Sequence, residues 1–140
     1  MQGSGIPMQV GDFVLHDFQG SAVDNTRNEV AKAVPRRVVV VAPTGAGKTF
    51  IALALIQLAR AKGASVGFIT SGRQLIGQMH RRLAQCQIEH TVFMDGMDSY
   101  MGPVSVISKD TLGARWDRVA YMPSRLMIVD EADICVSDWW

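Results

Sequence analysis

Short apolar runs alternate with longer helical patterns along most of the chain. The run at 38–41 is four consecutive valines, a continuous pattern typical of a strand covered on both faces. The segment 73–85 instead repeats its apolar residues at the spacing of an amphipathic helix. Strands that alternate with helices predict an α/β fold, with a parallel sheet flanked by helices. We expect strands at 38–41, 65–70, 89–94, 104–108 and 125–129, and helices at 21–34, 48–62, 73–85 and 111–118.

The predicted helices carry signals at their ends and along their sides. Ser21 fits an N-cap, and Pro35 ends the helix that Ser21 opens. The helix that opens at Lys48 is apolar nearly all round, which indicates burial, and Gly63 fits its C-terminal cap. We expect the buried sides to hold Ala22, Val23, Val30, Ala33 and Val34 in the first helix, and Leu75, Ile76, Met79 and Leu83 in the third.

Composition narrows the class of protein. A chain of 140 residues, 48% hydrophobic and 19% charged, fits one globular domain. The net charge of +1 argues against a strongly basic nucleic-acid binder but allows a local basic face. The two cysteines lack the spacing of metal ligands, and no apolar run approaches the roughly 20 residues of a membrane span. We expect a soluble, cytoplasmic protein, of a cell or of a phage-infected host.

The segment 42–49, APTGAGKT, lies between the predicted strand at 38–41 and the helix that opens at Lys48. Glycine lets successive N–H groups turn toward one ligand, and the helix start adds its own N–H groups and the positive end of its dipole. In this context Lys48 is predicted to reach the β- and γ-phosphates and Thr49 to hold Mg²⁺. The other reading is a glycine-rich turn before an ordinary helix. The nucleotide-binding residues expected here are Pro43, Thr44, Gly45, Ala46, Gly47, Lys48 and Thr49.

A second chemical cluster follows the predicted strand at 125–129. Asp130 and Glu131 come directly after it, at the carboxyl end where open α/β sheets bind ligands. Asp130 is placed to support Mg²⁺ together with Thr49, and Glu131 can take a proton from a water that attacks the γ-phosphorus. The other reading is an acidic strand end that faces solvent. We expect Lys48 and Glu131 to be the catalytic residues.

The two clusters together carry a resemblance to a known family. APTGAGKT with VDEAD resembles the first RecA-like lobe of superfamily-two helicases, and VDEADICVSDWW is similar to the DEAH-type ending of DNA-repair and phage helicases. LHDFQ resembles the glutamine motif that reads adenine, which implies Gln19, with His16 where an Arg is common. RQLIGQ and DTLGAR resemble motifs beside the nucleic-acid backbone, which implies Arg73 and Thr111. Asp133 stands in place of the His that couples hydrolysis to motion.

The resemblance implies a function and its cofactors. The fold would be a RecA-like P-loop lobe over 15–140, preceded by an N-terminal arm over 1–14. ATP would be the substrate, Mg²⁺ the cofactor, and nucleic acid the track, with DNA favoured over RNA. The lobe would belong to an ATPase motor, a helicase or translocase, that couples hydrolysis to movement or unwinding.

The resemblance also implies missing parts. Family members continue beyond the acidic motif with another strand and a second RecA-like lobe that supplies arginine fingers. We therefore expect a domain truncated after the Walker B strand, a gap in its sheet with exposed apolar surface, and hardly any hydrolysis by this chain alone.

Two other functions stay open from the residues alone. A P-loop kinase would need a pocket for a hydroxyl-bearing substrate and a lid. A non-catalytic nucleotide-binding module would need only the phosphate loop. We expect His80 and His90 to be surface or hydrogen-bonded residues and not ligands.

Overall fold

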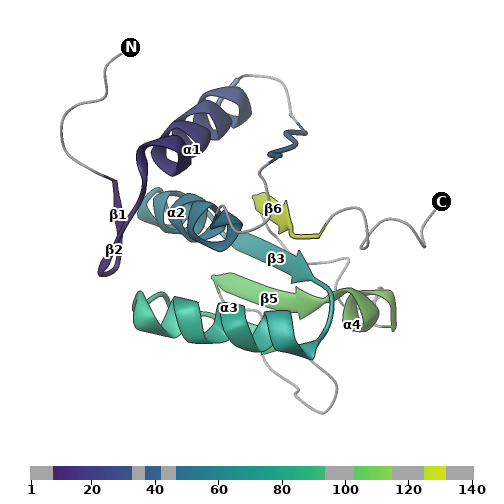
Figure 1. Cartoon of the computed structure of the whole chain (residues 1–140). Coiled ribbons are helices and arrows are strands. Elements are labelled where there is room, and N and C mark those ends of the chain that lie inside the picture. Colours follow the sequence, from purple (N-terminus) through teal and green to yellow (C-terminus); the bar gives the residue numbers. More distant parts are fainter. Residues whose placement is uncertain (1–7, 33–36, 42–46, 94–102, 115–124, 132–140) are drawn as a thin grey trace. The chain divides into compact units, whose positions relative to one another are not determined.

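The computed structural model describes residues 8–32, 37–41, 47–93, 103–114 and 125–131. The chain divides into two compact units, Met1–Gln57 and Leu58–Trp140. Figure 1 labels the helices and strands of both units.

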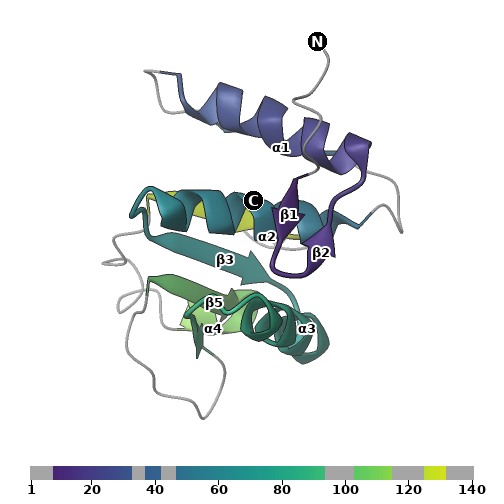
Figure 2. The same ribbon diagram turned by 90° about the vertical axis from the view of Figure 1, so that its left-hand side faces the viewer.

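The first unit begins with a short antiparallel hairpin. β1 (Gln9–Val10) pairs with β2 (Phe13–Val14), and the turn between them contains Gly11 at φ +56°. The N–H of Leu15 donates to the carbonyl of Met8 over 2.9 Å, which closes the base of the hairpin. Figures 1 and 2 show the hairpin directly before the first helix. Residues 8–14, which we expected to be part of an N-terminal arm, therefore carry regular structure.

The first helix begins earlier than its sequence predicts. α1 spans Asp17–Val30, whereas the pattern predicts 21–34, and the side chain of Gln19 is the reason. Gln19 Oε1 accepts the N–H of His16 over 2.9 Å, as the third helical residue does in a capping box. The shift also changes the buried side: Val23 is buried as expected, but Val30 is 42% exposed.

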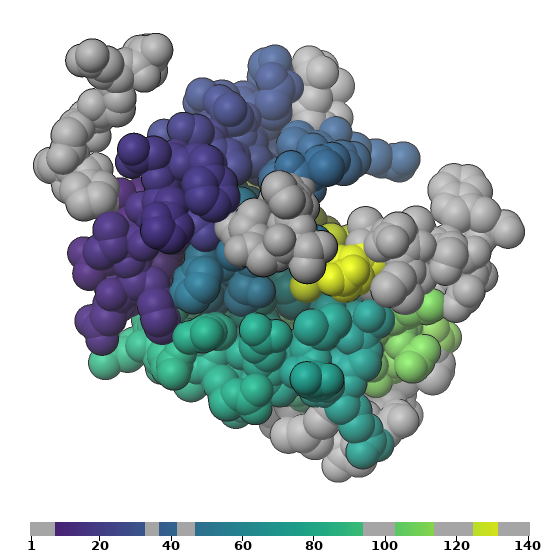
Figure 3. Space-filling model, in the orientation of Figure 1, coloured from purple at the N-terminus to yellow at the C-terminus, as the bar shows by residue number. Residues whose placement is uncertain are grey.

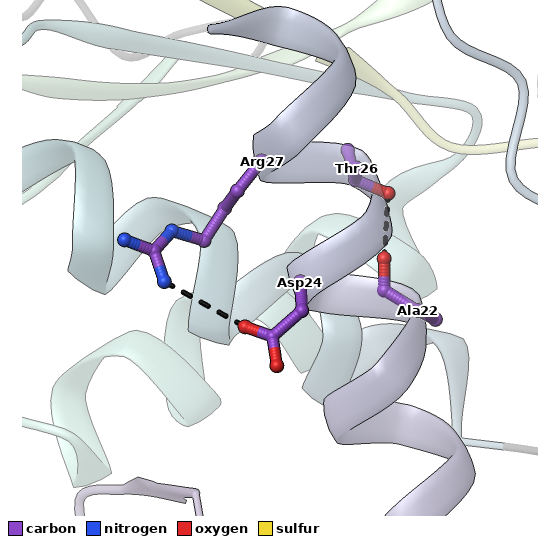
Figure 4. Close-up of polar contacts among 4 residues, drawn as sticks. All are labelled: Ala22, Asp24, Thr26 and Arg27. Carbon is purple, nitrogen blue, oxygen red and sulfur yellow. Dashed lines mark hydrogen bonds and ion pairs between the residues drawn. The ribbon is translucent and has the colours of Figure 1, made fainter. Parts of the chain in front are cut away.

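Polar residues of α1 use one another as partners (Figure 4). Thr26 Oγ1 donates to the carbonyl of Ala22 over 2.7 Å, so the hydroxyl is satisfied although Thr26 is buried. Arg27 and Asp24 form an ion pair of 3.6 Å on the exposed side. Such an exposed pair contributes at most about 1 kcal/mol, so the packing of Val23 and Thr26 fixes the helix more than its charges do.

α2 spans Lys48–Ala61, beginning in the first unit and ending in the second. Gly63 at φ +76° follows it, and its N–H donates to the carbonyl of Arg60 over 2.9 Å, which confirms the predicted cap. No helix in the described ranges has both the length and the apolar character that a membrane crossing needs. The buried residues of α2 are Ile51, Leu53, Ala54 and Ile56.

The second unit is built on a parallel sheet, which confirms the predicted α/β fold. The strand order is β4, β5, β3, β6, and every pairing is parallel. The two central strands are buried along their whole length, as is typical of a parallel sheet covered on both faces. The bounds are β3 Val66–Thr70, β4 Thr91–Phe93, β5 Val104–Ser108 and β6 Leu126–Val129.

Two helices contact β5. α3 spans Arg73–Gln85, as predicted, and buries Ile76, Met79 and Leu83, while Leu75 is only half-buried; it lies along β5 in Figures 1 and 2. α4 spans Lys109–Ala114 and starts two residues before its predicted position. Ser108 causes this shift, because its Oγ accepts the N–H of Thr111 over 3.0 Å and so caps the helix.

The valine run at 38–41 is not a strand, and this prediction was wrong. The run pairs with none of the described strands, and the exposed fractions of Val39 and Val41 are 84% and 90%. A β-branched run forms a strand only when a neighbouring strand satisfies its backbone, and no described strand of its own unit pairs with it. The strand β6 also leaves Met127 48% exposed and Val129 38% exposed.

Candidate nucleotide-binding site

Gln19 joins the first turn of α1 to the residue just before α2. Its Nε2 donates to the carbonyl of Gly47 over 3.2 Å, while its Oε1 accepts the N–H of His16. Gln19 is only 4% exposed, and two backbone groups hold the two ends of its amide. The residue predicted to read the base is therefore bonded to the last residue of the phosphate loop.

Gly47 occupies a backbone position that disfavours every other residue. Its φ is +75°, in the left-handed region that favours glycine, and a Cβ atom there would overlap Gln19 Nε2. Its carbonyl accepts the N–H of Phe50 over 3.0 Å and of Ile51 over 3.4 Å, so Gly47 is the N-cap of α2. The loop thus passes directly into a helix start, the local geometry that favours a bound phosphate.

Lys48 and Thr49 form the first two positions of α2, with Lys48 exposed and Thr49 half-buried. Both can therefore reach a group held at the helix start. The other predicted loop residues, Pro43, Thr44, Gly45 and Ala46, lie outside the described residues.

A hollow of about 480 Å³ opens beside Gln19, within the size range of small-molecule sites. The rings of Phe13 and Phe50 meet in its wall at 5.0 Å and 53°. The rings of His16 and Phe18 stack at 5.9 Å and 7°. An aromatic wall beside a fixed amide suits a flat heteroaromatic ring. The residues that line the hollow include Phe13, His16, Phe18, Gln19, Gly47 and Phe50.

Sequence analysis missed the phenylalanines of this wall. The only available signal was local: Phe18 lies within the glutamine motif LHDFQ, and Phe13 lies two residues before it. Phe50 comes from α2, so nothing in the sequence pairs it with Phe13. The sequence therefore located the centre of the hollow but not its wall.

Asp130 and Glu131 follow β6 directly, as predicted, at the carboxyl end of the parallel sheet. The N–H of Asp130 donates to the carbonyl of Ile69 over 2.9 Å, which extends the pairing of β6 with β3. Asp130 Oδ1 accepts the N–H of Glu131 over 3.0 Å, and Glu131 has φ +52°. A left-handed glutamate is strained, and such strain is common at functional positions.

The oxygen ligands predicted for Mg²⁺ fit that ion. Mg²⁺ binds hard oxygen donors and keeps several waters, so one hydroxyl and one carboxylate suffice when phosphate oxygens complete the shell. Thr49 and Asp130 supply such a pair. Thr49 belongs to the first unit and Asp130 to the second, so their approach across the sheet edge stays a prediction, as does that of Lys48 and Glu131.

The predicted nucleic-acid contacts differ in exposure. Arg73 is exposed at the first position of α3, whose outer side chains face the viewer in Figure 3. Thr111 is only 2% exposed, and its Oγ1 accepts the hydroxyl of Ser108 over 2.7 Å. Thr111 thus takes part in the start of α4. Asp133, the predicted coupling residue, lies outside the described residues.

Thr70 ends β3 at the carboxyl edge of the sheet, the edge at which Asp130 and Glu131 follow β6. It is fully buried, and its Oγ1 has no hydrogen-bond partner among the described residues. Its register neighbour on β5 is Ser108, whose hydroxyl bonds to Thr111. A buried hydroxyl without a partner costs stability, so Thr70 is an unsatisfied polar group at the edge where ligands of such sheets bind.

Comparison with known proteins agrees with this architecture. The model of the family "Type III restriction enzyme, res subunit" matches residues 12–133. The structure of the UvsW helicase from bacteriophage T4 is similar with a TM-score of 0.69 and 19% identity, over 94% of this chain and 48% of that one. A second structure of T4 UvsW gives 0.71 and 19%, over 96% of this chain and 29% of that one. The chain thus spans about half or less of these proteins. No curated protein matches the sequence.

The family match covers both chemical clusters, since it runs from the hairpin to beyond Glu131. The fold likeness adds a RecA-like α/β architecture. The chain belongs to the family of type III restriction enzyme res subunits, and its fold is a RecA-like α/β lobe.

Proposed function

We propose that the chain is the ATP-binding lobe of a nucleic-acid-dependent ATPase motor, which moves along or unwinds DNA or RNA. The observation that carries this proposal is the hydrogen bond from Gln19 to Gly47. It joins a base-reading side chain to the end of a phosphate loop, so one nucleotide can engage both. Membership of the res-subunit family supports the same function.

The nucleotide would lie with its base in the aromatic hollow and its phosphates at the start of α2. Gln19 would orient the adenine. Backbone N–H groups of residues 43–47 would surround the phosphates, and Lys48 would neutralise the β- and γ-phosphate oxygens. Lys48 would thereby also stabilise the charge that develops on the phosphoryl group in transfer.

Hydrolysis would use the acidic pair. Thr49 and Asp130 would hold Mg²⁺, which supplies positive charge beside the phosphates when bound. Glu131 would accept the proton of the attacking water while the γ-phosphoryl group leaves ADP. This arrangement requires Lys48 and Thr49 to meet Asp130 and Glu131 at one sheet edge. Asp133 would couple ATP hydrolysis to the motion of the motor.

A second RecA-like lobe would complete the site with an arginine finger, which contributes about 10³–10⁵ in rate in related NTPases. The track would contact Arg73 and the segment around Thr111. We favour DNA because the acidic ending, VDEADICVSDWW, is similar to that of DNA-repair and phage helicases. The motor would work in the cytoplasm, of a cell or of a phage host.

Two measurements test the proposal. ATP turnover by the intact protein is expected to rise with single- or double-stranded nucleic acid and to disappear in Lys48→Ala. Lys62→Ala is the matched control, since Lys62 is exposed just beyond the other end of α2. Turnover that ignores every nucleic acid would contradict the motor.

The competing function is a non-catalytic nucleotide-binding module. ATP binding without turnover by the intact protein, abolished by Lys48→Ala, would favour this module. Phosphate transfer to a small hydroxyl compound would instead indicate a P-loop kinase. ATP binding that is unchanged in Lys48→Ala would overturn the phosphate-loop assignment itself.

A further inference from the structure

Two of the three histidines of the chain meet on the second unit. His80 lies on the exposed side of α3, and His90 precedes β4. His80 Nδ1 and His90 Nε2 are 2.8 Å apart, and the rings meet edge to face with centroids 4.9 Å apart. The two ring nitrogens therefore share one hydrogen bond at a place that solvent can reach.

A backbone carbonyl settles which nitrogen of His90 carries the proton. His90 Nδ1 is 2.7 Å from the carbonyl oxygen of Ile88, and a carbonyl can only accept. Nδ1 of neutral His90 is therefore the N–H donor, and Nε2 carries the lone pair. It follows that His80 Nδ1 donates to His90 Nε2, and that the lone pair of neutral His80 lies on its Nε2.

His90 is thus already oriented as a metal ligand. A metal-bound histidine almost always donates its other N–H to a carboxylate, a backbone carbonyl or water, which fixes the tautomer and the ring. The bond to Ile88 provides this support before any ion binds. His80 needs one adjustment: its proton must move from Nδ1 to Nε2 by exchange with water, which leaves its net charge unchanged.

The distance between His80 Nδ1 and His90 Nε2 also fits a shared metal ion. Zinc–nitrogen bonds are about 2.0–2.1 Å long, so two adjacent ligand nitrogens lie about 2.9–3.4 Å apart for angles between square and tetrahedral. The observed 2.8 Å becomes such a separation when the two ring nitrogens move apart by about 0.1–0.6 Å. His80 is exposed on α3, so its ring can make this movement without repacking the core.

We propose that His80 and His90 form a binding site for a divalent transition metal of the zinc, nickel or copper class. Imidazole favours these ions over Mg²⁺, so the site differs in chemistry from the oxygen site at the nucleotide. No group of three or more His, Cys, Asp or Glu able to hold a metal exists in the described part of the chain, so water fills the remaining positions. The ion links α3 to His90, the residue directly before β4, and so stabilises the segment 86–90.

Titration of the whole chain with Zn²⁺, without nucleotide and followed by calorimetry, tests the site. One equivalent is expected to bind, and thermal unfolding is expected to shift upward, while Mg²⁺ at the same concentration gives neither effect at these residues. His80→Gln and His90→Gln are each expected to weaken Zn²⁺ binding at least about tenfold, the lower bound seen when even an outer partner of a metal site is removed. His16→Gln is the matched control, because it removes the third histidine and leaves the pair intact.

A second measurement does not depend on the stability of the variants. In the wild-type chain, substoichiometric Cu²⁺ is expected to broaden the ring proton signals of His80 and His90 before that of His16. Zn²⁺ binding equal in wild type and both variants, or broadening that begins at His16, would overturn the site and leave only a hydrogen-bonded pair. Neither result bears on the proposed ATPase, because the readouts use no nucleotide.

Discussion

Gln19 Nε2 donates a hydrogen bond of 3.2 Å to the carbonyl of Gly47, a residue 28 positions later in the chain. This bond ties the start of one helix to the start of another. It also makes two motifs that are separate in sequence into one structural feature. Changes at either residue are therefore expected to affect both local stability and nucleotide binding.

Gly47→Ala is expected to destabilise the chain and to weaken ATP binding. A side chain at φ +75° costs about 1–2 kcal/mol, and the added Cβ also displaces the amide of Gln19. Urea unfolding and ATP titration measure the two effects.

The control for Gly47 is Gly20→Ala, within α1. A Cβ at Gly20 meets nothing within 4 Å, so this variant is expected to gain about 0.5–1 kcal/mol of stability. If Gly47→Ala and Gly20→Ala change the free energy of unfolding in the same direction, the close contact between Gly47 and Gln19 is wrong.

Gln19→Ala is expected to lower ATP affinity and to reduce the preference for ATP over GTP. The variant loses the side chain that faces the hollow and leaves the carbonyl of Gly47 and the N–H of His16 without their present partner, at a cost of about 1–3 kcal/mol. Competition titration with GTP measures the preference.

Gln57→Ala is the matched control for Gln19. Gln57 Nε2 likewise donates to a backbone carbonyl, that of Gln9 over 3.1 Å, but this bond is exposed and outside the hollow. Its loss is expected to change stability by at most about 0.5 kcal/mol and to leave ATP selectivity intact. Equal losses of selectivity in both variants would rule out a base-reading role for Gln19.

Two buried threonines, Thr70 at the end of β3 and Thr111 in the first turn of α4, are expected to respond in opposite directions. Thr70→Val removes a buried hydroxyl without a partner among the described residues and is expected to stabilise the chain by about 1 kcal/mol. Thr111→Val removes the acceptor of the Ser108 hydroxyl and is expected to destabilise it by about 1–3 kcal/mol. Urea unfolding measures whether each variant raises or lowers the free energy of unfolding. A destabilised Thr70→Val would mean that Thr70 has a partner, such as a bound water or ligand.

Glu131 combines backbone strain with a proposed proton-accepting role, and two substitutions separate them. Glu131→Gln is expected to keep ATP binding and to reduce turnover by the intact protein at least about 10²-fold, since it cannot accept a proton. Glu131→Gly is expected to relieve the strain at φ +52° and to gain stability of about 1 kcal/mol, again without turnover. A Glu131→Gln variant that hydrolyses ATP normally would remove Glu131 from the chemistry.

Sequence reasoning succeeded where local pattern decides the structure. The bounds of α3 follow from apolar residues at helical spacing, and those of β5 from a short segment of valine and isoleucine interrupted by serine. The start of α1 was missed because the side chain of Gln19 and not the apolar pattern fixes it. The aromatic wall was missed because Phe13 and Phe50 meet only after folding. The valine run was misread because strand formation depends on a partner and not on composition alone.

The four exposed valines of 38–41 also have a consequence for handling the protein. An apolar, β-branched run that pairs with no described strand presents free backbone groups as a template for another polypeptide. Concentrated samples of the chain will therefore precipitate or form fibrils through this run. A lysine or proline introduced among the valines will act as a gatekeeper and raise the recoverable yield.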